Sequence, residues 1–436
     1  MTPFEIGLMA LGGMGVLVML GLYVPMALML CSFLGVWAIK GSPILAERLM
    51  ALAANDAISS YFFGVVPLFV LMGFIVSEAG LGRDAFDVAN AGFRKVKGGL
   101  GVGTVGANAI FAAITGISIA SAAVFTKIAV PQMMRHGYNP RFAVGVVAGS
   151  SVLGMMIPPS LLLILYGILT EQSIGDLFIA GIGPGLLLAV FFAGGIILMA
   201  IFAPKAVGTP DEPAEALSGR EVLTKGLPIA TLIILVLGGI YAGFFTPVEA
   251  GAMGSIGALL IGFARGSLTL PKLWRVLVDT GLVTAAVCFL IIAAQMYSRM
   301  LALSGVPAGI GDFAASADLG FWGLMLIYIA IVIVMGMILD SSSIMLILVP
   351  LMLPVVVPMG IDLVWFGIIT VLAVEIGLLT PPFGISVYVI KSTLDDPSIT
   401  LGDIFRGAAP FAGMMLLVLG LVLVFPVIAT GLVPGR

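Results

Sequence analysis

Asp340-Ser341-Ser342-Ser343 interrupts a long apolar part of the chain and places a carboxylate and three hydroxyls between hydrophobic flanks. Downstream, Glu375 and then Thr380-Pro381-Pro382 interrupt a second apolar run, residues 365–379. At membrane depth, polar groups and helix breaks are tolerated only where they are buried in protein or line a watery cavity. Paired interruptions of this kind indicate the binding site of a transporter.

The same pattern occurs earlier in the chain at a constant offset of 223 residues (341 − 118 = 223). Because one ungapped offset covers two hairpin-like stretches, we interpret it as an internal repeat. The matched positions are Ser341 with Ser118, Pro354 with Pro131, Gly360 with Gly137, Asp362 with Asn139, Gly377 with Gly154, and Pro381-Pro382 with Pro158-Pro159.

The composition indicates an integral membrane protein. Of 436 residues, 61% are hydrophobic and 9% are charged, and the mean hydropathy is +1.24. A soluble domain has about 25% charged residues. The first apolar run follows Met1 without a basic cluster, so it predicts a first transmembrane helix rather than a cleaved signal peptide.

Several functional classes are disfavoured. His136 is the only histidine and the acids are scattered, so we do not expect an enzyme. The net charge of −3 gives no reason to expect nucleic acid as a partner. No P-loop is present, which argues against an ATP-driven permease with its own nucleotide site.

The fold class that we predict is an all-α polytopic membrane protein of two inverted-topology repeats. Each half contains five apolar spans and one re-entrant hairpin, and an odd number of crossings turns the second half upside-down. A count different by one would make the repeats parallel instead. The predicted parts are a first repeat (1–203) with a hairpin (about 100–133) and a broken helix (142–169), a polar linker (204–223), and a second repeat (224–436) with a hairpin (about 321–358) and a broken helix (365–390). Amphipathic stretches at 40–61, 80–98 and 265–279 predict interfacial arms.

Six long motifs, taken in order, resemble the large membrane subunit of tripartite ATP-independent periplasmic (TRAP) transporters, and the resemblance covers nearly the whole chain. Small departures are Val248 and Gly251, where Thr and Ala are more usual. The motifs are Ile157-Pro158-Pro159-Ser160, residues 166–171 (Tyr-Gly-Ile-Leu-Thr-Glu), residues 180–185 (Ala-Gly-Ile-Gly-Pro-Gly), residues 238–241 (Gly-Gly-Ile-Tyr), residues 245–250 (Phe-Thr-Pro-Val-Glu-Ala) and residues 377–384 (Gly-Leu-Leu-Thr-Pro-Pro-Phe-Gly).

The resemblance implies a Na+-driven importer of small organic acids in the bacterial inner membrane. It also implies two protein partners, a small four-span membrane subunit and a periplasmic substrate-binding protein. Its fold would be that of the ion-transporter superfamily, in which an elevator domain carries hairpins and broken helices across the bilayer. The nearest alternative is a standalone sodium/dicarboxylate symporter of the same superfamily, and a channel is a further one.

Na+ needs several oxygen ligands, and hydroxyls and carbonyls freed at helix breaks supply them. Each proline also leaves a carbonyl one turn earlier without its helix partner. The competing explanations are that the serines bond their own backbone, that the prolines are packing kinks, and that Asp340 caps a helix. The predicted ligands are Ser118, Ala120, Gly149, Ser150 and Gly154 for Na+ site 1, and Asp340, Ser341, Ser343, Glu375, Gly377 and Thr380 for Na+ site 2. The predicted substrate contacts are Ser118, Ser121, Pro159, Ser341, Ser342 and Pro382.

Overall fold

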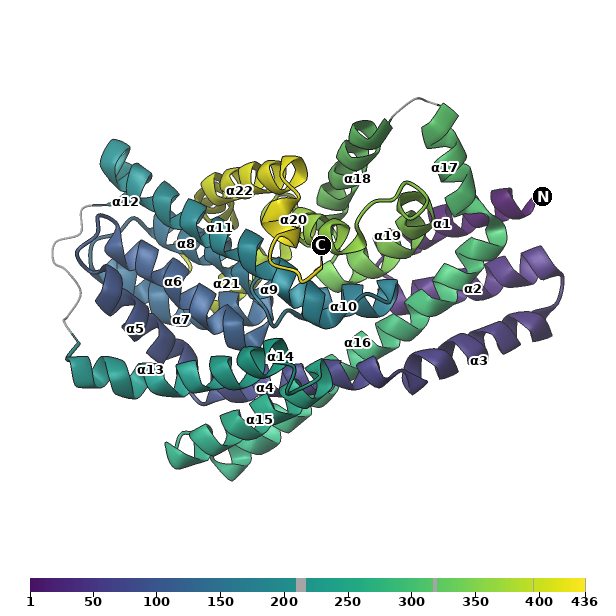
Figure 1. The fold of residues 1–436 in the computed structure, drawn as a ribbon. Helices are drawn as coiled ribbons and strands as arrows, with labels where there is room; N and C mark the ends of the chain where they lie inside the picture. The colour runs from purple at the N-terminus through teal and green to yellow at the C-terminus, as the bar shows by residue number, and fades with distance from the viewer. Residues whose placement is uncertain (209–216, 317–319, 395, 436) are drawn as a thin grey trace.

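The computed structural model of this chain describes residues 1–208, 217–316, 320–394 and 396–435 (Figure 1). Within these residues the regular structure is helical, and the one extended pairing is an isolated bridge between Tyr138 and Gly208. The predicted all-α fold is therefore confirmed.

Six helical stretches of the described chain are long and apolar enough to cross a membrane, and a seventh is counted if two helices joined at a 68° bend form one span. The N-terminal helices Pro3–Met19 and Val24–Lys40 are apolar but have 17 residues each, below the roughly 20 that a straight span requires. The six stretches are 140–170, 174–202, 219–241, 247–264, 270–304 and 401–424, and the bent pair is Val65–Glu78 with Leu81–Phe93.

The N-terminal part forms an outer group of helices. Prolines in the first turn start several of them, where a missing N–H costs nothing. Helices α3 and α5 lie where amphipathic arms were predicted. The elements are α1 (Pro3–Met19), α2 (Val24–Lys40), α3 (Pro43–Ser59), the 3-10 helix η1 (Tyr61–Gly64), α4 (Val65–Glu78) and α5 (Leu81–Phe93).

The first predicted hairpin and broken helix both form. Gly116 has a φ of +66° at the hairpin turn, a conformation that favours glycine. The broken helix stops before Pro158-Pro159 and restarts at Leu161, where the Ser160 hydroxyl accepts a hydrogen bond from the Leu163 N–H. The elements are α6 (Gly99–Thr115), α7 (Ser118–Arg135), α8 (Pro140–Ser151), α9 (Leu153–Met156), α10 (Leu161–Thr170) and α11 (Ile174–Phe202).

The middle of the chain differs from the sequence prediction in two places. Helix α13 begins at Gly219, inside the predicted linker, because Ser218 and Glu221 form a capping box. The predicted interfacial arm at 265–279 belongs mostly to α16, a helix of 35 residues that continues through Gly281 into the apolar part. Residues 209–216 of the linker lie outside the described residues. The elements are α12 (Pro204–Val207), α13 (Gly219–Ile233), the π segment η2 (Ile234–Gly238), α14 (Gly239–Tyr241), α15 (Pro247–Ala264) and α16 (Leu270–Ser304).

The second hairpin and broken helix repeat the plan of the first. Asp362 caps α20 through its side chain, as Asn139 caps α8 at the matched position. Every residue from Val364 to Leu379 is buried, so α20 lies at the centre of the protein. The elements are α17 (Val306–Ser316), α18 (Gly320–Gly336), α19 (Ser341–Val356), α20 (Leu363–Leu379), α21 (Ile385–Thr393), α22 (Leu401–Val424) and α23 (Val427–Thr430).

The two halves contact each other reciprocally. Helix α7 packs on α21, and its counterpart α19 packs on α10, so each hairpin contacts the post-proline helix of the other half. Likewise α8 packs on α22 while α20 packs on α11, and α4 packs on α15 while α16 packs on α2. Such exchanged contacts are the signature of a two-fold relation between equivalent parts.

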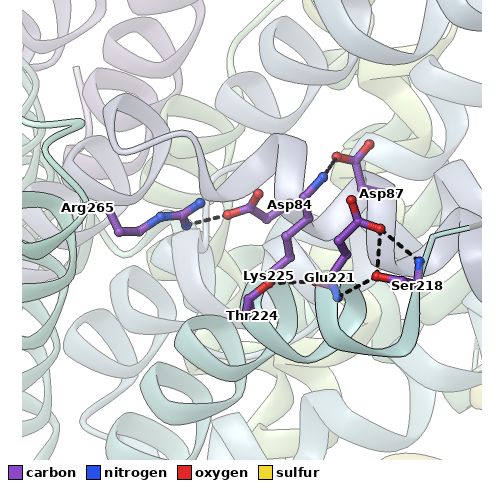
Figure 2. A network of polar contacts seen from close by, with 7 residues as sticks. All are labelled: Asp84, Asp87, Ser218, Glu221, Thr224, Lys225 and Arg265. Atoms are coloured by element: carbon purple, nitrogen blue, oxygen red, sulfur yellow. Dashed lines mark hydrogen bonds and ion pairs between the residues drawn. The ribbon is translucent and has the colours of Figure 1, made fainter.

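Ion pairs join the α4–α5 arm to helices of the second half. Figure 2 shows Asp84 paired with Arg265 and Asp87 paired with Lys225, beside the Ser218–Glu221 capping box. Lys272 lies 3.3 Å from Glu78 of the same arm. The first two pairs join α5, which packs along hairpin helix α6, to α13 and to the end of α15, and the third joins the end of α4 to the beginning of α16.

Candidate functional site

The turn of the first hairpin is held by the broken helix of the same half. The Leu161 N–H, just after the prolines, donates to the Gly116 carbonyl at 3.1 Å. A Cβ added to Gly154 would lie 3.0 Å from the Ser118 nitrogen, so α9 lies directly against the hairpin tip. Glycine at position 154 therefore permits this close approach.

The second hairpin turn is held in the equivalent way. The Phe383 and Gly384 N–H groups donate to the Met337 carbonyl at 3.2 and 3.4 Å, and Gly384 is the residue matched to Leu161. The turn itself is two residues longer. Helices α7 and α19 start 223 residues apart (341 − 118), whereas α6 and α18 end 221 apart (336 − 115). Asp340 lies in this longer turn.

Glu375 belongs to helix α20 of the second half, but it lies at the tip of the first hairpin. Its side chain is 1% exposed, and the Ser118 hydroxyl at the start of α7 is its polar neighbour. Neither carboxylate oxygen of Glu375 has a hydrogen-bond partner, and the Ser118 hydroxyl has none. Helix α7 also lacks a side-chain cap, because Ile117 occupies the capping position. An acidic group thus lies beside an uncapped helix N-terminus, which favours negative charge.

Further buried oxygens lie on the helices around this tip. The Ser121 hydroxyl on α7 and the Ser386 hydroxyl on the contacting helix α21 have no hydrogen-bond partner. Asn108 on α6 donates to the Ser150 hydroxyl at 2.8 Å, while its own carbonyl oxygen is unbonded. Hydroxyl, amide and carboxylate oxygens are the donors that a hard cation takes, so this set fits Na+.

Asn108 was missed by the sequence prediction. Its signal was available, since it is a lone amide in the apolar first limb of a predicted hairpin. Ser386 gave no comparable signal, because a single serine in a helix usually bonds its own backbone.

The residues predicted for Na+ site 1 separate into two groups. Ser118 and Gly154 meet at the hairpin tip, and Ser150 is joined to hairpin helix α6 through Asn108. Gly149 instead packs against Phe411 of α22, where an added Cβ would lie 2.4 Å from the ring. Ala120 is partly exposed on α7.

Of the residues predicted for Na+ site 2, Glu375 lies beside Ser118 of the other half. Asp340 caps α19 by accepting from the Ser343 N–H at 3.1 Å and from the Ser343 hydroxyl, the capping alternative that the sequence left open. Ser341 is buried at the first position of the same helix. Gly377 allows α20 to cross α18 at Gly336, and the Thr380 hydroxyl donates to the Ile376 carbonyl at 2.7 Å.

The predicted substrate residues differ in accessibility between the halves. Ser118, Ser121 and Pro159 of the first half are buried, whereas in the second half Ser341 is buried, Ser342 is partly exposed and Pro382 is exposed. A cavity of about 450 Å³ lies next to Pro382, between hairpin residue Ile338 and the start of α21. The second tip therefore faces open space while the first is enclosed. The other residues that line the cavity are Phe383, Ile385, Tyr388, Val389 and Ser392.

Comparison with known proteins identifies the family to which this architecture belongs. Residues 11–428 match the family described as "Tripartite ATP-independent periplasmic transporter, DctM component". The chain belongs to this family. The resemblance predicted from the sequence motifs is thereby confirmed, and this DctM-family chain is a multi-pass protein of the bacterial inner membrane.

Two relatives show how the family varies. The C4-dicarboxylate TRAP transporter large permease protein DctM of Pseudomonas aeruginosa is 33% identical, over 88% of this chain and 89% of the relative. The sialic acid TRAP transporter large permease protein SiaM of Vibrio cholerae is 32% identical, over 85% of both chains. The comparisons thus point to a transporter rather than an enzyme, and relatives of similar identity are named for different substrates.

The fold is shared with a more distant transporter of known structure. The YdaH transporter of Alcanivorax borkumensis superposes with a TM-score of 0.60 at 15% sequence identity, over 88% of this chain and 90% of that one. At this identity the likeness describes the fold alone.

The cap on α19 can be separated from any cation-binding role of Asp340. Replacing it with alanine (D340A) should lower the free energy of unfolding by about 0.5–2 kcal/mol, because the Ser343 N–H loses its acceptor. D340N keeps a side-chain oxygen for the cap and removes the charge, so its stability should stay near that of wild type. Thermal unfolding of both variants in detergent is the measurement. Equal stability of D340A and wild type would contradict the capping role.

Proposed function

We propose that this chain is the large permease subunit of a Na+-coupled secondary importer for a small organic acid, which a periplasmic binding protein delivers. The observation that carries the coupling is the buried carboxylate of Glu375, which lies beside the Ser118 hydroxyl at the tip of the first hairpin but makes no hydrogen bond of normal geometry. A buried carboxylate is costly unless a cation or a proton neutralises it. The family description, "ATP-independent", supports a gradient as the energy source.

The surrounding donors favour Na+ over a proton as the neutralising species. Ser118, Ser121 and the Asn108 carbonyl are unbonded oxygens on the two limbs of the first hairpin. A proton needs one acceptor, whereas Na+ needs several oxygens at once. At the second hairpin, Ser341 and the residues preceding Pro381-Pro382 would supply a related site.

The division of the helices supports an elevator mechanism as part of this proposal. The hairpins and broken helices pack on each other around the buried helix α20, so they can move as one body. Helices α2, α3, α4, α15 and α16 contact one another and lie along the lower side of Figure 1, where they would form the fixed scaffold. The two-fold relation between the halves supports repeats, and these are inverted if each half crosses the membrane an odd number of times, as the sequence predicts.

The substrate class is supported by the relatives, which are named for C4-dicarboxylates and sialic acid, both organic acids. The word "tripartite" in the family description supports two further components, for which we propose the small four-span membrane subunit and the binding protein. A standalone symporter of the wider superfamily is the second candidate, because the YdaH fold likeness covers most of this chain.

The first test concerns Na+. S118A and E375Q should each reduce the Na+ dependence of uptake into proteoliposomes by removing an oxygen or a charge from the first tip, and S341A should act at the second. T231A, which removes a hydroxyl that donates to the Leu227 carbonyl on α13, is the control and should transport normally. Uptake that a proton gradient drives at full rate without Na+ would contradict the proposal.

The second test concerns the partners. Reconstituted alone, this chain should not take up free organic acid at a useful rate, and adding the small subunit with the loaded binding protein should restore uptake. The assay uses radiolabelled candidate acids in sealed proteoliposomes. Rapid uptake by the chain alone would favour the standalone symporter.

The third test concerns the elevator. In a background without Cys31 and Cys288, single cysteines at the repeat-matched positions Ile119 and Ser342 should change accessibility to a membrane-impermeant thiol reagent together when Na+ and substrate are varied. A cysteine at Leu52 on α3 is the fixed control. Tips whose accessibility stays constant under every condition would rule out the moving body.

A further inference from the structure

A cavity of about 510 Å³ lies between the N-terminal helix α1 and the second hairpin, α18 with α19. Its walls include Leu11 and Gly15 from α1, Ile331 from α18 and Leu351 from α19. Tyr328 carries the one polar group among the lining side chains, and its hydroxyl is hydrogen-bonded to Thr370 at 2.9 Å. The lining of the cavity is therefore almost entirely apolar.

This lining selects the kind of molecule that the cavity can hold. An organic acid would lose the hydration of its carboxylate and gain no hydrogen bond in return. Water is disfavoured for the same reason, since apolar cavities stay dry. An empty space of this size forfeits the dispersion contacts that close packing provides. A hydrocarbon chain has no polar group to dehydrate, is compatible with a dry apolar wall and restores the missing dispersion contacts.

The cavity opens onto the outer surface of the protein. Three of its lining residues are substantially exposed, namely Met19 (66%), Ile327 (45%) and Ile331 (45%). In a membrane-spanning chain, exposed aliphatic side chains on an apolar helix such as α18 face lipid. Acyl chains of the bilayer are therefore adjacent to the opening.

A second hollow of about 410 Å³ adjoins the first and contains a charge. Both are lined by Leu324, and both lie against α17 and α19. Among the described residues that line the second hollow, Asp312 of α17 is the charged one, and Gly320, the first residue of α18, lies in the same lining. An acidic group at the end of an apolar cavity complements a positively charged headgroup and repels an anionic one.

We propose that the α1–hairpin cavity binds a bilayer phospholipid, with an acyl chain between α1 and the second hairpin and an amine headgroup at Asp312. The phospholipid class that fits is phosphatidylethanolamine, because it combines two acyl chains with a primary ammonium. The bound chain fills the space between the N-terminal helix and the hairpin that carries Asp340 to Ser343. This inference is independent of the coupling ion and of the substrate.

A substitution at Gly15 can test whether a lipid binds in the cavity. It lines the cavity, and a Cβ added there meets no atom within 4 Å, so G15L fills space without a clash against protein. Gly12 on the same helix is equally unobstructed but does not line the cavity, so G12L is the matched control. The two variants add the same side chain to the same helix.

The experiment uses the full chain in phosphatidylcholine vesicles that contain phosphatidylethanolamine with a diazirine in one acyl chain. After illumination, mass spectrometry should find cross-links on the α1, α18 and α19 residues of the cavity in wild type and G12L. Most of these cross-links should be lost in G15L, while thermal unfolding shows that both variants remain folded. Equal labelling of G15L and G12L, or labelling confined to other helices, overturns the site.

The headgroup is tested with the same diazirine chain on phosphatidylglycerol. Phosphatidylethanolamine should label the cavity more strongly in wild type, and D312N should abolish that preference. Equal or stronger labelling by phosphatidylglycerol in wild type overturns the headgroup assignment. Protection of the cavity by an organic acid, or by added small subunit, would show that substrate or a partner helix occupies it, and would overturn the lipid assignment.

Discussion

The hydrogen bonding of the two hairpin turns constrains the rest of this structure. Each turn exposes backbone carbonyls in a region rich in apolar side chains, where an unpaired polar group is costly. The N–H groups after the prolines bond to them, from Leu161 to Gly116 and from Phe383 and Gly384 to Met337. A break in one helix is thus paired with a turn in another, and neither is satisfied without the other.

This pairing explains why the two halves interlock. Once each post-proline segment is fixed to the hairpin of its own half, helices α10 and α21 project against the hairpin of the opposite half, on α19 and α7. The exchange buries α20 from Val364 to Leu379 and brings its carboxylate to the first tip. A site made from both halves follows from the backbone pairing within each half.

The two tips are chemically unequal despite the repeat. Asp340 neutralises the start of α19 from within its own turn, which is two residues longer than the first. Helix α7 has Ile117 at that position, and Glu375 supplies its acidic neighbour from α20. Each hairpin helix therefore meets one carboxylate, but one comes from its own turn and the other from the opposite half. The first tip is also enclosed, while the second faces a cavity.

The sequence by itself determined the membrane class, the repeat, both hairpins and both broken helices, because hydropathy, proline and glycine act locally and one offset linked the halves. Only the tertiary structure decided that Glu375 lies beside Ser118 of the other half, and that Asn108 donates a hydrogen bond to Ser150. Those contacts depend on how helices far apart in the chain cross each other. No local property of a residue records the helix that will pack against it.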